Sequence, residues 1–191
     1  MDPKDRYKHL INARNFHYEN FNKWMTYFYV AIGALFVGYY SIITSVKCLR
    51  MEEISISVLG FITSLLWYWS SKGYYHWNIN FITLVNECEK NDLKLKDEER
   101  VYFVFANKKS QNDYINPISG ANISTSKISI LFAFIITVVW GVILADKLFG
   151  LDYWITICIS IFITLTISAI IPRILLRSKN DHFPDLKIDQ K

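Results

Sequence analysis

The sequence lacks the short motifs that would assign it a familiar chemistry. Its seven glycines never fall in a GxGxxG or GxxxxGK frame, so no phosphate-binding glycine loop of those kinds is present. Its four histidines are scattered, without the HxxxH or HExxH spacing of a metal site. We therefore expect no cofactor, no metal site and no enzymatic activity.

Cysteine is also scarce. The three cysteines are Cys48, Cys88 and Cys158, which fall in different predicted segments and form no CxxC pair. No two of them are placed to form a disulfide. We expect each to be an unpaired, small hydrophobic residue.

Charge is missing from four long apolar stretches, and this is the strongest feature of the sequence. Residues 24–46, 54–71, 128–148 and 153–175 are mostly apolar, with charged residues only near their ends. About 20 such residues suffice for an α-helix to cross the core of a bilayer. The sequence therefore predicts an all-α integral membrane protein with four transmembrane helices. The spans offer no buried Asp, Glu or His for proton coupling, which argues against active transport.

The second span continues as an amphipathic helix after its lipid-facing pattern stops at Lys72. Apolar residues then recur at spacings of three and four, the heptad pattern of a helix that packs along one stripe. We call these residues the stalk seam: Tyr74, Trp77, Phe81, Leu84 and Cys88. We expect a cytoplasmic helical extension of the second span, whose seam contacts other copies of the chain or a partner protein.

Lysine and arginine orient the spans. Of the 21 Lys and Arg residues, 18 lie before residue 24, between residues 72 and 127, or after residue 172. Since cytoplasmic segments are rich in these residues, both termini and the central segment are predicted to be cytoplasmic. The predicted order is a cytoplasmic amphipathic helix (1–23), a first transmembrane hairpin (24–71), a cytoplasmic stalk helix and loop (72–127), a second transmembrane hairpin (128–175) and a cytoplasmic tail (176–191).

The segment after the stalk is harder to assign. Residues 89–100 are rich in charge and are typical of a solvated turn. Residues 101–105 are apolar and fit either a strand or a buried helix, and the acidic residues ahead of them favour the start of a helix.

The fourth span carries a hydroxyl at every fourth position. This hydroxyl row comprises Thr156, Ser160, Thr164 and Ser168. A row of small residues with the same spacing runs along the third span and comprises Ser129, Ala133, Thr137, Gly141 and Ala145. Such rows either let two helices approach closely or line a wet path within an oligomer, and both alternatives stay open.

Basic residues near the predicted cytoplasmic membrane surface are candidate contacts for a ligand or for lipid. They are Arg14, Lys72, His76, Arg100, Lys108 and Lys109. Aromatic neighbours could stack a nucleotide base between these cations. Acidic residues nearly balance basic ones between residues 72 and 127, so no direct DNA binding is expected.

One short pattern has a catalytic interpretation. Arg177 and His182 fit Arg-x4-His, which resembles the signature of a HEPN-type RNase. That resemblance implies an arginine that binds phosphate and a histidine that contributes to phosphodiester cleavage. Because Pro184 follows and no helical domain surrounds the pattern, a basic anchor next to the membrane is the favoured interpretation.

The layout resembles small four-span membrane effectors of bacterial antiphage defence. The similarity rests on the span count, the stalk at residues 73–89 and the loop at residues 116–127. Two families share it: the four-span effectors found beside cyclic-oligonucleotide synthases, and the membrane accessory protein of type VI-B CRISPR loci.

The resemblance implies a homo-oligomer in the bacterial inner membrane that permeabilises or depolarises the bilayer when triggered. It also implies two partners besides lipid, a cytoplasmic defence nuclease or a cyclic nucleotide. The alternative is a membrane scaffold that recruits and modulates a cytoplasmic defence partner.

Overall fold

The computed structural model describes residues 2–46, 49–105 and 113–177, and every regular element in those ranges is helical. In chain order these are α1 (Pro3–Ile43), α2 (Arg50–Glu87), the π-helical turn η1 (Cys88–Asp92), the 3-10 turns η2 (Asp97–Glu99) and η3 (Phe103–Phe105), α3 (Thr125–Phe149), α4 (Tyr153–Ile171) and the π-helical turn η4 (Pro172–Leu176). Four of these helices are long and apolar enough to cross a membrane. The predicted all-α fold with four spans is confirmed.

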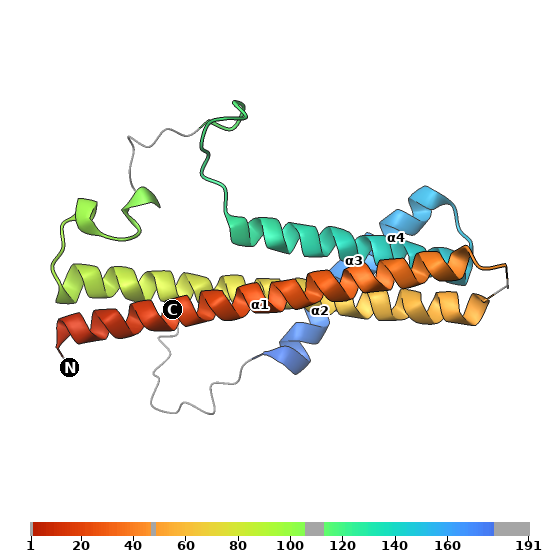
Figure 1. Cartoon of the computed structure of the whole chain (residues 1–191), viewed down its shortest axis with the longest axis horizontal. Coiled ribbons are helices and arrows are strands. Elements are labelled where there is room, and N and C mark those ends of the chain that lie inside the picture. The colour runs from red at the N-terminus through yellow and green to blue at the C-terminus, as the bar shows by residue number, and fades with distance from the viewer. Residues whose placement is uncertain (1, 47–48, 106–112, 178–191) are drawn as a thin grey trace.

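Two very long helices, α1 and α2, lie side by side along the length of the molecule (Figure 1). With 41 and 38 residues they are each about 60 Å long, at 1.5 Å per residue. α2 passes Lys72 without a break, so the helical extension of the second span is confirmed. α1 is equally continuous, because neither Gly nor Pro occurs between Pro3 and Gly33. The amphipathic segment 1–23 is therefore not a separate helix but the first half of α1.

α3 and α4 are shorter and cover only one half of the long pair (Figure 1). Their ends have local sequence causes. Ser124 caps α3, its Oγ accepting a hydrogen bond from the amide of Lys127 at 3.4 Å. Gly150 ends α3 in a left-handed conformation with φ 58°, which suits a residue without a Cβ atom. Asp152 then caps α4.

The core lies where α2 packs between α1 and α3. Trp140 of α3 is fully buried and stacks on Phe36 of α1, with ring centroids 4.6 Å apart. Its indole lies against Gly60 of α2, where an added methyl group would overlap the ring. Trp67 is equally buried and donates a hydrogen bond from Nε1 to the sulfur of Met25 at 3.0 Å. Only a glycine at position 60 lets α2 and α3 come this close.

The segment after the stalk differs from the expectation in two ways. Glu89 was assigned to a solvated turn, and that prediction was wrong because the residue is 0% exposed. The buried face of α2 continues past Val85 into the π-helical turn η1, and this turn places the Glu89 side chain inside the protein. Residues 101–105 form neither a strand nor an α-helix but end in the single 3-10 turn η3.

Candidate functional site

The stalk seam lies largely against α1 of the same chain. Tyr74 is 6% exposed and stacks on Phe21, with ring centroids 3.5 Å apart, and on His17 at 4.7 Å. The Phe81 ring lies 5.2 Å from the same histidine. These aromatic contacts hold the first half of α1 on the stalk, so this part of the seam is occupied within one chain.

The remaining seam residues differ in exposure. Cys88 is buried and Leu84 is half-buried, whereas Trp77 is 48% exposed. Trp77 lines a shallow hollow together with Trp24 of α1. Within the seam, Trp77 therefore offers the largest aromatic surface to another molecule.

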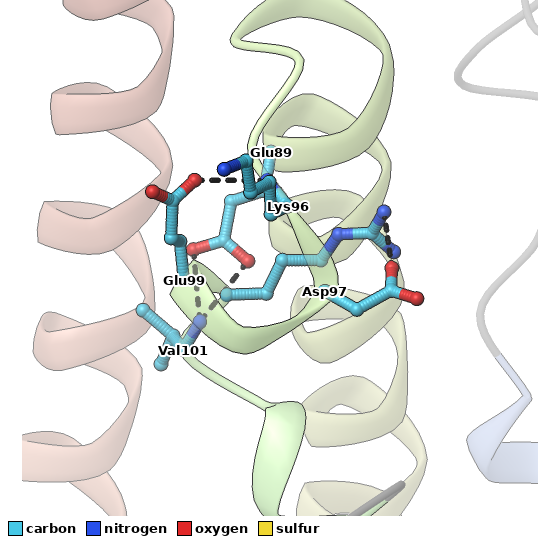
Figure 2. Close-up of polar contacts among 6 residues, drawn as sticks. Glu89, Lys96, Asp97, Glu99 and Val101 are labelled. Atoms are coloured by element: carbon cyan, nitrogen blue, oxygen red, sulfur yellow. Dashed lines mark hydrogen bonds and ion pairs between the residues drawn. The ribbon is translucent and has the colours of Figure 1, made fainter.

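A buried carboxylate joins three segments at the end of the stalk. Glu89 accepts a hydrogen bond from the hydroxyl of Tyr7 at 2.9 Å, which reaches it from α1. The amide of Val101 donates to both of its carboxylate oxygens at 3.3 Å (Figure 2). We call Glu89 and these two partners the tip cluster. It fastens both the start of α1 and the segment after η2 to the end of α2.

The segment that the tip cluster holds is itself ordered by local bonds (Figure 2). The Glu99 side chain accepts a hydrogen bond from the amide of Lys96 at 2.9 Å, which closes the η2 turn. Arg100 forms an ion pair with Asp97 at 2.7 Å. The Val101 amide is thereby presented to Glu89 from a fixed turn.

Two groups at the tip, Tyr7 and Cys88, have raised pKa values. Burial, together with the hydrogen bond to Glu89, raises the pKa of Tyr7 to about 12, so the phenol remains a donor at neutral pH. Burial raises the pKa of the Cys88 thiol, and the neighbouring Asp92 adds to this effect. Cys88 is therefore a weak nucleophile in the closed tip.

Sequence reasoning missed Glu89, although a signal was present. Asn78 and Val85 are seven residues apart, both are buried, and Glu89 follows Val85 at a spacing of four. Extending this series of buried positions by one member predicts that the Glu89 carboxylate is buried. Its position within a run of charged residues concealed it.

Two arginines among the candidate ligand contacts have partners at the tip. Arg14 donates to the hydroxyl of Tyr102 at 3.0 Å. Arg100 is engaged by Asp97, as described above. Arg6, which was not among the candidates, pairs with Asp92 at 2.7 Å and adds a further link between α1 and η1. These arginines link the elements at the tip, and the Nε atoms of Arg14 and Arg100 are buried without a hydrogen-bond partner among the described residues.

Lys72 and His76 lie on α2, close to the apolar run of the second span. Lys72 Nζ is 5.4 Å from the centroid of the Tyr68 ring, a cation–π contact. The His76 ring meets the edge of Trp77 at 6.1 Å. Lys108 and Lys109 lie outside the described residues. The four described candidates do not form one cluster, because Arg14 and Arg100 have partners at the tip whereas Lys72 and His76 have aromatic partners on α2.

The hydroxyl row of α4 faces α3 within the chain. Thr156, Ser160 and Thr164 are each at most 3% exposed. A methyl group built at Gly141 of α3 would lie 3.2 Å from the Cβ atom of Ser160, so the two helices are close there. Ser168 accepts a hydrogen bond from the Trp69 indole of α2 at 2.9 Å. In this arrangement the row serves helix packing.

Some hydroxyls of the row have no hydrogen-bond partner among the described residues. Thr156 bonds to the carbonyl of Asp152 at 2.9 Å, in the usual manner of hydroxyls in helices. Ser160 Oγ, Thr164 Oγ1 and the nearby Trp140 Nε1 are buried and have no hydrogen-bond partner among the described residues. A polar group left unpaired in a dry environment raises the free energy of that state. Two buried hydroxyls of the α3–α4 seam therefore lack a hydrogen-bond partner among the described residues.

Across residues 2–46, 49–105 and 113–177, no three His, Cys, Asp or Glu side chains come together to hold an ion. Of the Arg-x4-His pattern, Arg177 is the last described residue and His182 lies beyond the described range.

A family model matches most of the chain. The model of the octameric membrane protein family, 8xMP, matches residues 4–149, from the first turn of α1 to the end of α3. No curated protein and no solved structure matches the chain. The match includes the long α1–α2 pair, the tip cluster and α3, but not the hydroxyl row of α4.

Proposed function

The chain belongs to the octameric membrane protein family, and from this premise we propose that eight copies assemble in a bacterial inner membrane and permeabilise or depolarise it during antiphage defence. The protein is an oligomeric, multi-pass membrane protein. The proposal adds the number of copies, the membrane, the defence role and the effect on the bilayer. Both termini and the stalk face the cytoplasm in this proposal, because lysine and arginine concentrate there.

The observation that carries the proposal is the incompletely satisfied α3–α4 seam. Ser160 and Thr164 hold buried hydroxyls without partners where α4 meets α3. Several other hydroxyls in the spans bond to the carbonyl one turn earlier, as Thr137 does at 2.7 Å. Water between α3 and α4 would satisfy both free hydroxyls. We therefore propose that the conducting state separates these two helices, which turns a dry packing seam into a wet path.

α4 is suited to such a movement. Its outer face is apolar and exposed, with Phe162 at 71% and Leu165 at 50% exposure. Lipid or a neighbouring copy can cover this face equally well, so movement of α4 does not expose new apolar surface to water. Its main polar tie to α2 is the single hydrogen bond from Trp69 to Ser168.

A reversible cross-link tests this mechanism. Cysteines replacing Gly141 and Ser160, in a chain without its three native cysteines, would place two Cβ atoms close to disulfide distance. We expect oxidation to keep reconstituted vesicles tight and reduction to restore ion leak. The matched control is Thr166→Cys with Gly141→Cys, because Thr166 is exposed on α4. Equal leak from the oxidised and reduced Gly141–Ser160 protein would refute an opening at this seam.

The mass of the purified protein tests the assembly itself. Light scattering of the detergent complex should give eight copies. A monomer whose vesicles stay tight under every trigger would end the effector proposal.

A second function is favoured by exposed apolar residues on the cytoplasmic loop. Ile115 and Ile118 are both 93% exposed between the stalk and α3, and Trp77 is exposed on the stalk. They suit a scaffold that recruits a cytoplasmic defence nuclease, or a partner controlled by a cyclic nucleotide. Trp77→Asp should abolish capture of such a partner without changing the mass of the oligomer. Loss of the oligomer in the same variant would instead assign Trp77 to assembly.

We also propose that the protein is not an enzyme. The weak rival is a membrane-tethered RNase that uses Arg177 and His182. Replacing His182 with alanine should leave the activity of the protein in cells unchanged, and loss of activity in that variant would revive the catalytic interpretation.

A further inference from the structure

One side of α1 is uncovered along most of the helix. Of its 41 residues only Met25 and Ile32 are buried, and α1 packs chiefly on α2. On the opposite side, exposed residues recur at spacings of three, four and seven, which place them on one stripe of the helix. We call this stripe the outer face of α1, and its members are Asn12, Phe16, Lys23, Val30, Ala34 and Val37.

The half of the outer face that precedes the first span lies beyond the reach of lipid acyl chains. Phe16 comes eight residues before Trp24, where the apolar run begins, or about 12 Å along the helix. Its side chain is nonetheless 66% exposed. Glu19 and Lys23, which have opposite charges, follow on the same side and are exposed as well. An aromatic residue beside polar residues of both signs has the composition of a protein–protein contact, with an anchor and a polar rim.

The half of the outer face within the first span carries short side chains. Val30, Ala34 and Val37 are exposed there, whereas the exposed residues of α4 include the larger Phe162 and Leu165. The span in α1 is also less apolar than those in α3 and α4, although it is the least buried of the four. A span whose free side met only lipid should be among the most apolar. Short side chains instead allow a second helix to approach closely.

An oligomer of this chain needs such contact faces. The family is octameric, and its model matches residues 4–149, which contain the whole outer face. Copies that share one orientation in a membrane are related by rotation about the membrane normal, so eight of them form a closed ring. Each copy in a ring touches its two neighbours through two different faces.

We propose that the outer face of α1 is one of these two contact faces, covered from Asn12 to Val37 by a neighbouring copy. Acyl chains can cover only the half within the span, and a soluble partner only the half before it. A neighbouring copy, with its own long α1–α2 pair, extends across both halves. This inference rests on the proposed assembly of eight copies and adds the surface that forms it.

Light scattering of the detergent-purified full-length protein tests the face at two places. Ala34→Phe puts a ring into the close contact within the span, and it should raise the protein concentration needed for assembly at least tenfold. Phe16→Asp removes the anchor before the span and should act in the same direction. The matched controls Ala34→Ser and Phe16→Leu should retain eight copies. Because both positions are exposed within one chain, all four variants should keep the helix content of the wild type in circular dichroism.

A thiol reporter tests whether one neighbour covers both halves. In a chain whose native cysteines are replaced by serine, Asn12→Cys should react slowly with a water-soluble maleimide in the assembled protein. Adding Ala34→Phe, about 33 Å away along α1, should accelerate this labelling at least tenfold, because loss of the neighbour uncovers the whole face. A local effect of the new ring would not reach position 12. Adding Ala34→Ser should leave the rate unchanged.

The outcomes separate this inference from the proposed assembly. A wild-type monomer would overturn both. An octameric wild type whose Ala34→Phe and Phe16→Asp variants also keep eight copies would overturn the assignment of this face alone, and so would fast labelling at position 12 in the octamer. If Ala34→Phe loses helix content, Phe16→Asp and the labelling rate of Asn12→Cys without a second substitution decide the question.

Discussion

Replacing Glu89 with alanine should open the stalk tip without unfolding the spans. The change leaves two buried donors, the Tyr7 hydroxyl and the Val101 amide, without an acceptor. Each unsatisfied donor costs about 1–3 kcal/mol, and loss of the buried charge offsets part of that. We therefore expect the closed tip to lose about 3 kcal/mol relative to the open one, which raises the open population roughly a hundredfold.

Cys88 reports this opening directly. It is 1% exposed beside Glu89, so a maleimide can reach its thiol only when the tip opens. With Cys48 and Cys158 replaced by serine, the labelling rate follows the open population. Glu89→Ala should accelerate labelling roughly a hundredfold and Glu89→Gln roughly tenfold, because glutamine keeps one acceptor oxygen. Glu89 is the smallest of the causes that shift the pKa of the Cys88 thiol. Removing Glu89 therefore changes the fraction of reactive thiolate too little to explain a hundredfold faster labelling.

Glu87 provides the matched control, because it lies two residues earlier on α2 and is exposed. Glu87→Ala removes the same side chain without touching the tip cluster. Similar labelling rates in the Glu87 and Glu89 variants would refute the idea that this carboxylate fastens the tip.

Three further predictions concern stability. Gly60→Ala drives a methyl group into the Trp140 indole and should lower the free energy of unfolding by about 2 kcal/mol, or the melting temperature in detergent by roughly 6 °C. The control Gly73→Ala, with open space around it, should raise the melting temperature. The raised pKa of Tyr7 means that the folded tip retains a proton which the unfolded chain loses from pH 10 upward, so tip stability should fall as pH rises from 10 to about 12. Tyr7→Phe should reduce this slope in amide exchange, leaving the smaller part that comes from the raised pKa of Cys88, and an unchanged slope would contradict it. Gly150→Ala must adopt φ 58° and should cost about 1 kcal/mol, measured in the same melting assay.

The spans and the stalk could be predicted because their signals are local. An uncharged apolar run requires a helix in lipid, and the spacing from Tyr74 to Cys88 continues that helix. The cap at Ser124 and the stop at Gly150 follow from the same kind of short-range pattern. These features depend on residues within one or two turns of each other.

The tip cluster depends on partners that are distant in the chain, so the sequence did not reveal it. Nothing near Glu89 in the chain indicates that Tyr7, 82 positions earlier, supplies its hydrogen bond. The apolar neighbours of Asn78 in the chain give no sign that its Oδ1 is buried without a hydrogen-bond partner. The hydroxyl row was recognised, but only the fold places it against α3.

The unbroken helices α1 and α2 give the molecule a mechanical property. Each helix contains two glycines, Gly33 and Gly38 in α1 and Gly60 and Gly73 in α2, yet neither helix is interrupted there. A displacement at the stalk tip is therefore transmitted along the pair and is not absorbed at a break between shorter helices. At the far end the ion pair between Glu53 and Lys147, at 2.8 Å, links α2 to α3. The pair therefore links the stalk tip mechanically to the other end of the molecule, some 60 Å away.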